Sequence, residues 1–231
     1  MKITYWSDYA CPFCYIGETH LKQALSQLGL ENTEVEMLAF ELNPDAPKVY
    51  SGTTLDRFAK KYGLTREMAA QRIESISQMG RAAGLDFRYA ETRSTNTFDA
   101  HRLTKLARKL GGQALANRVS ERLYRAYFTE TLELADHAVL RRIAVEEGMD
   151  EQAVTVLLEG EDFGMEVRLD EREAERYGVT GVPYFLIGRY AVPGAMGVEQ
   201  MKEVLQKALR EETDRPEQAG MTCGPDGCKI G

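Results

Sequence analysis

The sequence predicts an α/β fold in which a large all-helical insertion follows the second strand. Three observations lead to this fold class. Residues 2–7 and 33–42 have strand patterns on either side of an amphipathic helix over residues 11–28. Residues 51–159 show helical periods only, and residues 163–210 follow the order helix, strand, strand, helix. A chain of 231 residues with 43% hydrophobic content can bury one core that carries such an insertion.

The first unit reads as strand, helix, strand. Lys2–Ser7 is a short strand-like run, and the next helix repeats its apolar residues at helical spacing until about Leu28. Residues 33–42 then form a largely alternating strand pattern, which Asn43-Pro44 ends. Strands joined by a helical crossover are expected to run parallel.

Capping side chains divide the insertion into separate helices. Thr53, Thr65, Asp136 and Asp150 each precede a segment of helical periodicity. Their oxygens can accept hydrogen bonds from the free N–H groups of a first turn. The expected helices of the insertion cover about residues 54–62, 65–83, 97–110, 113–128, 136–147 and 150–158.

The remaining elements follow the insertion. We expect a charged helix over residues 163–177 and an apolar strand over residues 181–188, with Pro183 near its start. A short partner strand over residues 189–192 and a helix over residues 197–210 complete the order.

These elements predict two structural units and a tail. Residues 1–50 and 160–210 are assigned to one α/β domain, and residues 51–159 to a helical insertion subdomain. Residues 211–231 are polar, contain Gly and Pro, and are predicted to form a flexible C-terminal tail with a Cys-x4-Cys motif.

Cys11-Pro12-Phe13-Cys14 stands between the first strand and the first helix, where a dithiol redox site is expected. The free N–H groups and the dipole of a helix start favour negative charge near Cys11. Pro12 suits the first turn because it has no N–H to leave unpaired. The thiolate is the reactive form of cysteine, so we expect Cys11 to attack a disulfide and Cys14 to resolve the mixed disulfide.

Other uses of these two cysteines are a structural disulfide, half of a zinc site, or inert core thiols. The chain opens Met1-Lys2 and reaches Asp8 without an apolar segment of signal-peptide length, so we expect a cytoplasmic protein. In the cytoplasm thiols stay reduced unless they are catalytic or redox-sensing, which favours a redox role.

Composition argues against several classes of partner. The net charge is −7 and no block of Lys and Arg stands out, so nucleic acid and anionic membranes are not expected partners. No apolar run approaches membrane-spanning length. The three histidines, at positions 20, 101 and 137, are scattered and do not indicate a metal cluster.

The order of elements and three segments resemble those of a known family. The segments are Asp8-Tyr9-Ala10-Cys11-Pro12-Phe13-Cys14-Tyr15-Ile16-Gly17, Phe40-Glu41-Leu42-Asn43-Pro44 and Gly181-Val182-Pro183-Tyr184-Phe185. They are similar to the DsbA-like thioredoxin-fold family, in particular to its cytosolic FrnE-like branch, over about residues 1–210. The resemblance implies a thioredoxin-like domain with a helical insertion and a protein disulfide oxidoreductase or isomerase activity.

The resemblance also implies a substrate-binding segment. In this family the bond before the proline that matches Pro183 is cis and faces the Cys-x-x-Cys motif, and the residue that matches Val182 pairs with an extended substrate. A trans proline that starts an edge strand is the alternative. Pro12 and Phe13, between the two cysteines, are the other expected substrate contacts.

Cys223 and Cys228 form a second pair. The Gly-Pro-Asp-Gly between them favours a tight turn. The segment from Arg210 to Cys223 could span about 40 Å if extended, so the pair could reach the first motif. A second redox pair, no role, or a zinc site shared with the first pair are the alternatives for these residues.

Two other side chains could act near the motif. Glu18, four residues after Cys14 on the same helix face, could accept the proton of Cys14, although a solvated carboxylate is the commoner case. His101, near the start of an insertion helix, fits a packed or capping histidine better than a catalytic base.

The leading functional hypothesis is a thiol–disulfide oxidoreductase, acting as oxidase or isomerase, that exchanges disulfides with protein substrates through Cys11 and Cys14. A glutathione-dependent isomerase or transferase of small molecules, similar to 2-hydroxychromene-2-carboxylate isomerases and kappa-class transferases, is the alternative. Those enzymes typically have serine where Cys11 stands, which weighs against this alternative. A redox-regulated chaperone or a zinc-binding module is the alternative from another class.

The same hypothesis sets the expected cofactors and partners. No cofactor is expected beyond the redox-active disulfide, with glutathione a candidate co-substrate, and no resident metal. The expected partners are protein thiols and disulfides and an electron partner of the thioredoxin or glutathione type.

Overall fold

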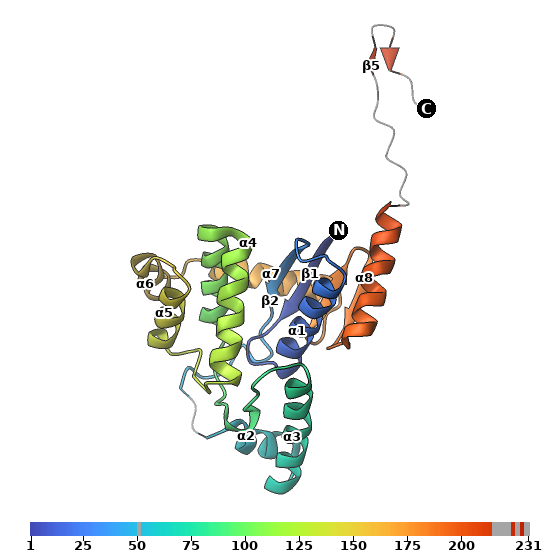
Figure 1. Cartoon of the computed structure of the whole chain (residues 1–231). Coiled ribbons are helices and arrows are strands. Elements are labelled where there is room, and N and C mark those ends of the chain that lie inside the picture. The colour runs from blue at the N-terminus through green and yellow to red at the C-terminus, as the bar shows by residue number, and fades with distance from the viewer. Residues whose placement is uncertain (50–51, 214–222, 225–226, 229–231) are drawn as a thin grey trace.

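A computed structural model of the protein describes residues 1–49, 52–213, 223–224 and 227–228, with side chains up to residue 212. The strands are β1 (Lys2–Ser7), β2 (Glu34–Ala39), β3 (Tyr184–Ile187), β4 (Tyr190–Pro193), β5 (Cys223–Gly224) and β6 (Gly227–Cys228). The helices are α1 (Pro12–Gln27), α2 (Thr54–Tyr62), α3 (Arg66–Ala82), the 3-10 turn η1 (Tyr89–Glu91), α4 (Phe98–Phe128), α5 (His137–Glu146), α6 (Glu151–Glu159), α7 (Gly164–Arg176) and α8 (Val198–Thr213). Figure 1 shows α2 to α6 gathered beside and below the main sheet, away from α8.

The main sheet has four strands in the order β2-β1-β3-β4. β1 runs parallel to β2 and antiparallel to β3, so Tyr5 stands opposite both Met37 and Phe185. β3 and β4 pair antiparallel through a tight connection. The predicted α/β fold class, with the helical insertion between the second and third strands, is confirmed.

Helices cover both faces of this sheet because its strands alternate their apolar side chains. Tyr5 and Phe185 pack with α1 and α8, where Met201 is fully buried. Trp6, one position along β1, packs on the opposite face with Ala174 of α7. The first helix is therefore held against the sheet along its length, which fixes the position of its N-terminus.

The strands expected over residues 33–42 and 181–188 are both shorter in the structure. β2 ends at Ala39, and the backbone N–H of Leu42 donates instead to the carboxylate of Asp8, at 2.7 Å. β3 begins only at Tyr184, directly after a proline that has no N–H to donate to a ladder. Both differences lie at the edge of the sheet where the first helix begins.

The helices expected over residues 97–110 and 113–128 are joined into the single helix α4. A kink separates the two halves at Gly111 and Gly112. Gly112 has φ 65°, a left-handed conformation that glycine adopts without steric cost. The predicted break between residues 110 and 113 is thus confirmed, because Gly111 and Gly112 are the non-helical residues that separate the two halves of α4.

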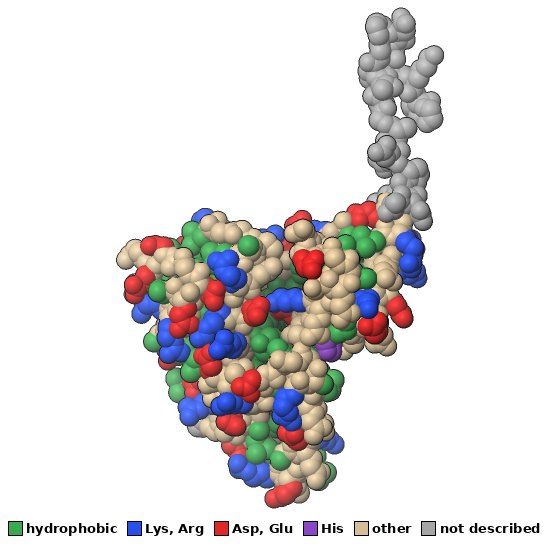
Figure 2. Space-filling model, in the orientation of Figure 1, with side chains coloured by type: hydrophobic (Ala, Val, Ile, Leu, Met, Phe, Trp, Pro, Cys, Tyr) green, Lys and Arg blue, Asp and Glu red, His purple; other side chains and the backbone are tan. Residues whose placement is uncertain are grey.

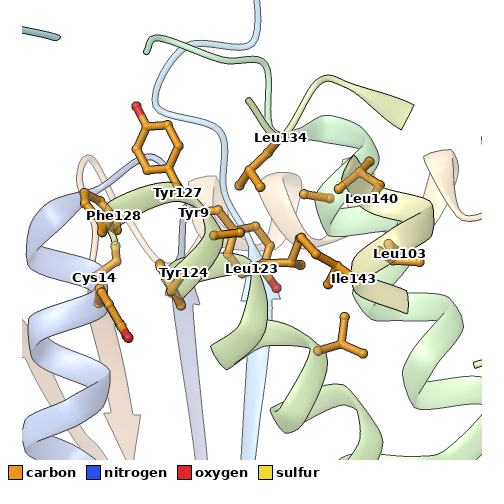
Figure 3. Packing of buried hydrophobic residues seen from close by; sticks show 14 of the residues in the cluster. Tyr9, Cys14, Leu103, Leu123, Tyr124, Tyr127, Phe128, Leu134, Leu140 and Ile143 are labelled. Atoms are coloured by element: carbon orange, nitrogen blue, oxygen red, sulfur yellow. The ribbon is translucent and has the colours of Figure 1, made fainter. Parts of the chain in front are cut away.

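The largest core cluster joins α1 to the insertion. Tyr15 of α1 stacks on Tyr124 of α4, with ring centroids 4.9 Å apart and planes 3° apart. Phe128, at the end of α4, stacks on both Tyr15 and Phe87. Figure 3 shows Cys14 beside Phe128, with Tyr124 close by and the aliphatic core of α4 and α5 further along. The insertion therefore forms one wall of the environment of the cysteine motif.

Most of the predicted tail, residues 214–222, 225–226 and 229–231, lies outside the described residues. β5 pairs antiparallel with β6, and the register places the backbone of Cys223 opposite that of Cys228. The side chains of these two cysteines are not among those described, so their role stays a prediction. Within the described part of the chain, no helix is both long and apolar enough to cross a bilayer.

Candidate functional site

The first cysteine of the motif stands at the start of α1. Cys11 is the N-cap residue, with extended backbone angles φ −91° and ψ 116°, and Pro12 opens the helix. The Cys11 thiol donates to the carbonyl oxygen of Val182, with the sulfur 3.5 Å from that oxygen. The sulfur of Cys11 thus lies at the helix start that the sequence predicted, against the segment that precedes β3.

The second cysteine is enclosed by protein. Cys14 is fully buried, and its sulfur accepts a hydrogen bond from the backbone N–H of Asp8, at 3.5 Å. Burial, and then the neighbouring Cys11 thiol, raise the pKa of the Cys14 thiol well above its usual value. Both cysteines are free thiols in this structure. Cys14 therefore remains protonated near neutral pH, which suits a resolving cysteine rather than an attacking one.

Asp8 holds the loop before the motif in place. One of its carboxylate oxygens accepts the N–H of Ala10 at 3.1 Å and the other accepts the N–H of Leu42 at 2.7 Å. Its backbone carbonyl accepts the N–H of Cys11 at 3.0 Å. One buried side chain thus ties the Cys-x-x-Cys loop to the segment after β2.

The peptide bond between Val182 and Pro183 is cis, as the family resemblance implied. Pro183 packs against α1 at Gly17, which has no side chain. A Cβ at Gly17 would lie 3.1 Å from Cγ of Pro183 and 3.3 Å from Cζ of Phe185. Glycine at this position lets the proline segment approach the helix that carries both cysteines.

A Gly17→Ala substitution should therefore disturb the site. Overpacking of this kind costs about 1–3 kcal/mol, of which the better helix propensity of alanine offsets up to about 1 kcal/mol. Because Pro183 must shift from its place beside Cys11, mixed-disulfide formation should slow more than stability falls. Gly197→Ala, where the nearest atom is 3.9 Å from the added Cβ, is the matched control. Equal rates for the two variants, measured by stopped-flow thiol exchange, would contradict the proposed role of this contact.

Cys11, which is 3% exposed, lines a cleft of about 640 Å³. Pro12, Phe13, Gly181 and Val182 line this cleft with it. Phe13 is the most exposed of the motif residues, at 36%. The predicted substrate contacts, except the buried Pro183, thus lie around one opening. The insertion supplies another part of the wall through Arg57, Phe58, Lys61, Tyr62, Tyr89 and Tyr127.

Glu18 and His101, the two other side chains considered from the sequence, are both buried. Glu18 is buried, not solvated: one carboxylate oxygen pairs with Lys22 at 2.9 Å and the other has no hydrogen-bond partner among the described residues. His101 is also buried and stacks on Tyr9, with ring centroids 4.9 Å apart. His101 does not line the cleft, in agreement with its interpretation as a packed residue.

Tyrosines of the insertion, and not the aromatic residues of β1, contribute to the wall of the cleft. Tyr5 and Trp6 belong to the sheet core and do not line the cleft. Tyr89 and Tyr127 of the insertion line it instead. Sequence reasoning missed them because Phe128 joins their rings from the end of α4, far from Tyr89 in the chain, and no local pattern marks them.

The buried state of Cys14 predicts how the resolving step depends on pH. A raised pKa leaves a smaller thiolate fraction at neutral pH, and below that pKa the fraction grows about tenfold per pH unit. With an aromatic disulfide reagent, release of the first chromogenic thiol reports attack by Cys11, and release of the second reports resolution by Cys14. The second release should accelerate about tenfold per unit between pH 7 and 9. A flat profile over this range would mean that Cys14 is already ionised.

Comparison with known proteins finds a matching family model and similar solved structures. The model of the DSBA-like thioredoxin domain matches residues 2–206. A probable DsbA oxidoreductase from Streptomyces coelicolor is 34% identical, with a TM-score of 0.86 over 100% of this chain and 99% of that one.

Two more distant structures share the fold. A 2-hydroxychromene-2-carboxylate isomerase is 14% identical, with a TM-score of 0.67 over 93% of this chain and 98% of that one. The cytosolic disulfide reductase DsbM from Pseudomonas aeruginosa, solved with GSH, is 18% identical, with a TM-score of 0.63 over 91% of this chain and 100% of that one.

Proposed function

We propose, from the fact that this chain belongs to the DSBA-like thioredoxin domain family, that it is a thiol–disulfide oxidoreductase acting through Cys11 and Cys14. One observation carries the proposal. Cys11 is the N-cap of α1 and lines the cleft, with 3% of its surface exposed, while Cys14 is fully buried and does not line the cleft. Such an asymmetric pair suits attack by one sulfur and resolution by the other.

The reaction follows from this arrangement. The Cys11 thiolate attacks a substrate disulfide, and one substrate sulfur leaves as a thiolate. Cys14 then attacks the Cys11 sulfur, which releases the second substrate sulfur and leaves a Cys11–Cys14 disulfide. The carbonyl of Val182, which accepts the Cys11 thiol, borders the space in which the mixed disulfide would lie. Buried Glu18, on the same helix, is a candidate acceptor for the proton of Cys14.

Protein disulfides are the proposed substrates, and a thioredoxin- or glutathione-type thiol is the proposed electron partner. A cytoplasmic location is part of the same proposal, supported by the likeness to a cytosolic disulfide reductase. Turnover of insulin disulfides by the reduced protein, with capture of a mixed disulfide on a Cys14→Ser variant, tests the proposal.

A glutathione-dependent isomerase of small molecules remains the second candidate. The shared fold and the cleft of about 640 Å³ favour it. Cys14 separates the two candidates, because an isomerase that only activates a thiol cofactor has no use for a resolving cysteine. Its removal should abolish net disulfide reduction and leave an isomerase activity in place.

For Cys223 and Cys228 we propose a second redox pair that exchanges with the first. Removal of residues 214–231 should leave the melting temperature unchanged, because it preserves the pairs of Glu211 with Arg189 and of Glu212 with the N-terminal amine. Turnover with a regenerating thiol should change. A zinc site shared between the two pairs predicts bound metal in the full chain and a clear loss of stability on truncation, since structural zinc contributes folding energy. Melting temperature, metal content and exchange rate together separate these cases.

A further inference from the structure

Two positively charged side chains of the insertion line the cleft beside Cys11. Arg57 and Lys61 both come from α2. Nε of Arg57 is buried without a hydrogen-bond partner among the described residues. Nζ of Lys61 lies 5.5 Å from the ring centroid of Tyr62, and neither cation forms an ion pair with a described side chain.

Within α2, no carboxylate forms an ion pair with Arg57 or Lys61. Arg57 and Lys61 are one helical turn apart, where like charges repel each other and destabilise a helix. The carboxylate of α2, that of Asp56, already accepts the backbone N–H of Thr53 at 3.0 Å and pairs with Arg66 at 2.7 Å. The two cations therefore reduce the stability of α2 and are not explained by local structure.

Arg57 lies within electrostatic reach of the same tyrosine as Cys11. Burial raises the pKa of the Tyr89 hydroxyl, and the charges of both Arg57 and Cys11 act on that hydroxyl. Tyr89 and Cys11 line the cleft together with Arg57. An anion that contacts Arg57 in this cleft therefore lies in the cleft that Cys11 also lines.

Negatively charged side chains are almost absent among the described residues that line the cleft. Among the described residues that line it, Asp8 is the only acidic one, and both of its carboxylate oxygens accept backbone N–H groups. The chain as a whole carries a net charge of −7, and Figure 2 shows acidic and basic side chains interspersed over the face in view. The unpaired cations of the cleft thus stand against the overall charge of the protein.

We propose that this cleft selects small disulfides that carry carboxylates, and that Arg57 and Lys61 bind those carboxylates while Cys11 attacks the S–S bond. The proposal rests on the proposed thiol–disulfide exchange and names the class of its small-molecule partner. A small molecule fits because the cleft, about 640 Å³ with walls from both the α/β domain and the insertion, has the size of a small-ligand site.

The exchange balances without another reactant. The reduced protein has two thiols, and the small disulfide RSSR accepts two electrons. Cys11 displaces one RS⁻, and Cys14 displaces the second as the Cys11–Cys14 disulfide forms. The two thiolates take up the two protons lost by the cysteines, giving oxidised protein and two RSH.

Three disulfides of different charge test the proposal. Oxidised glutathione carries carboxylates, bis(2-hydroxyethyl) disulfide is neutral, and cystamine is cationic. The full-length protein is used with Cys223→Ser and Cys228→Ser, so that tail thiols do not contribute. Oxidation rates of the reduced protein are compared with those of an Arg57→Gln, Lys61→Gln variant. The single variant Lys61→Gln is measured as well, and Lys60→Gln, which removes one positive charge from α2 at a position outside the cleft lining, is its matched control.

We expect the ratio of the glutathione rate to the neutral rate to fall about tenfold in the double variant, and the preference for cystamine to rise. The control should keep the wild-type ratio. Raising the ionic strength from 0.01 M to 0.5 M should reduce the wild-type ratio, because salt screens such contacts.

The outcomes separate this inference from the function on which it rests. Equal ratios in the wild type and the double variant overturn the role of the two cations, whatever the absolute rates. Failure of all three disulfides to oxidise the protein, or oxidation that persists in a Cys11→Ser variant, would instead overturn the exchange function. Glutamine is a good helix former, so the double variant should keep the wild-type circular dichroism spectrum.

Discussion

A Cys11→Ser variant should lose disulfide exchange with insulin by at least about a thousandfold, because it removes the nucleophile. Of the two motif cysteines, Cys11 lines the cleft and Cys14 does not. A serine hydroxyl is not ionised near neutral pH and cannot form a mixed disulfide. The measurement is the rate of insulin reduction in the presence of dithiothreitol, at equal protein concentration.

The Cys14→Ser variant completes this experiment. It should still attack substrates but hold them as mixed disulfides, which a non-reducing gel and mass spectrometry detect on the peptide that contains Cys11. Capture on position 14 in the Cys11→Ser variant, at a rate similar to that of the opposite variant, would reverse the assigned roles. The fully buried sulfur of Cys14 makes that outcome unexpected.

An Arg102→Ala substitution should lower the free energy of unfolding by about 3–5 kcal/mol. Arg102 is buried and donates to Asp99 at 2.7 Å. Its other nitrogens donate to the carbonyl oxygens of Leu157, Gly160 and Asp162, each at 2.7 Å. Alanine would leave these three carbonyls without this donor, at the loop that leads from α6 to α7.

Urea unfolding at pH 7 measures this effect, with the midpoint expected to fall and the slope to stay constant. Arg102→Lys should recover only part of the loss, because one ammonium group cannot replace a planar guanidinium with four bonds. Arg66→Ala, which removes an exposed partner of Asp56, serves as the control and should leave the midpoint nearly unchanged. A midpoint for Arg102→Ala close to that of this control would contradict the structural role.

The order of the main secondary structure elements was predictable because their signals are local. Thr53, for example, accepts the N–H of Asp56 in a complete capping box, as its sequence indicated. The ends of β2 and β3 were less predictable. β2 ends early where the N–H of Leu42 turns to the carboxylate of Asp8, a tertiary contact that no local pattern encodes. β3 begins late because Pro183 has no N–H for the ladder.

Some residues of the candidate site were predictable from the sequence and others were not. Cys11, Cys14 and the Val182-Pro183 segment could be found from short motifs, because each has a fixed place relative to a helix or strand start. The wall formed by Arg57 and Tyr89 could not, because it depends on how the insertion packs against α1. Glu18 was interpreted wrongly for a related reason: a charge on a helix face is usually solvated, and only the packing of α1 against the sheet buries this one.

The stacking of Tyr15 on Tyr124 and Phe128 has a consequence for protein engineering. The helical insertion is one continuous segment of the chain, but its buried aromatic side chains pack against α1, which lies outside that segment. Excising residues 51–159 would strip the helix that carries both cysteines of one side of its packing. A chimera that carries the insertion of a relative must therefore also take over that relative's residue at the position of Tyr15, together with those at Tyr124 and Phe128. The specificity of its cleft and the packing that supports the two cysteines will then change together.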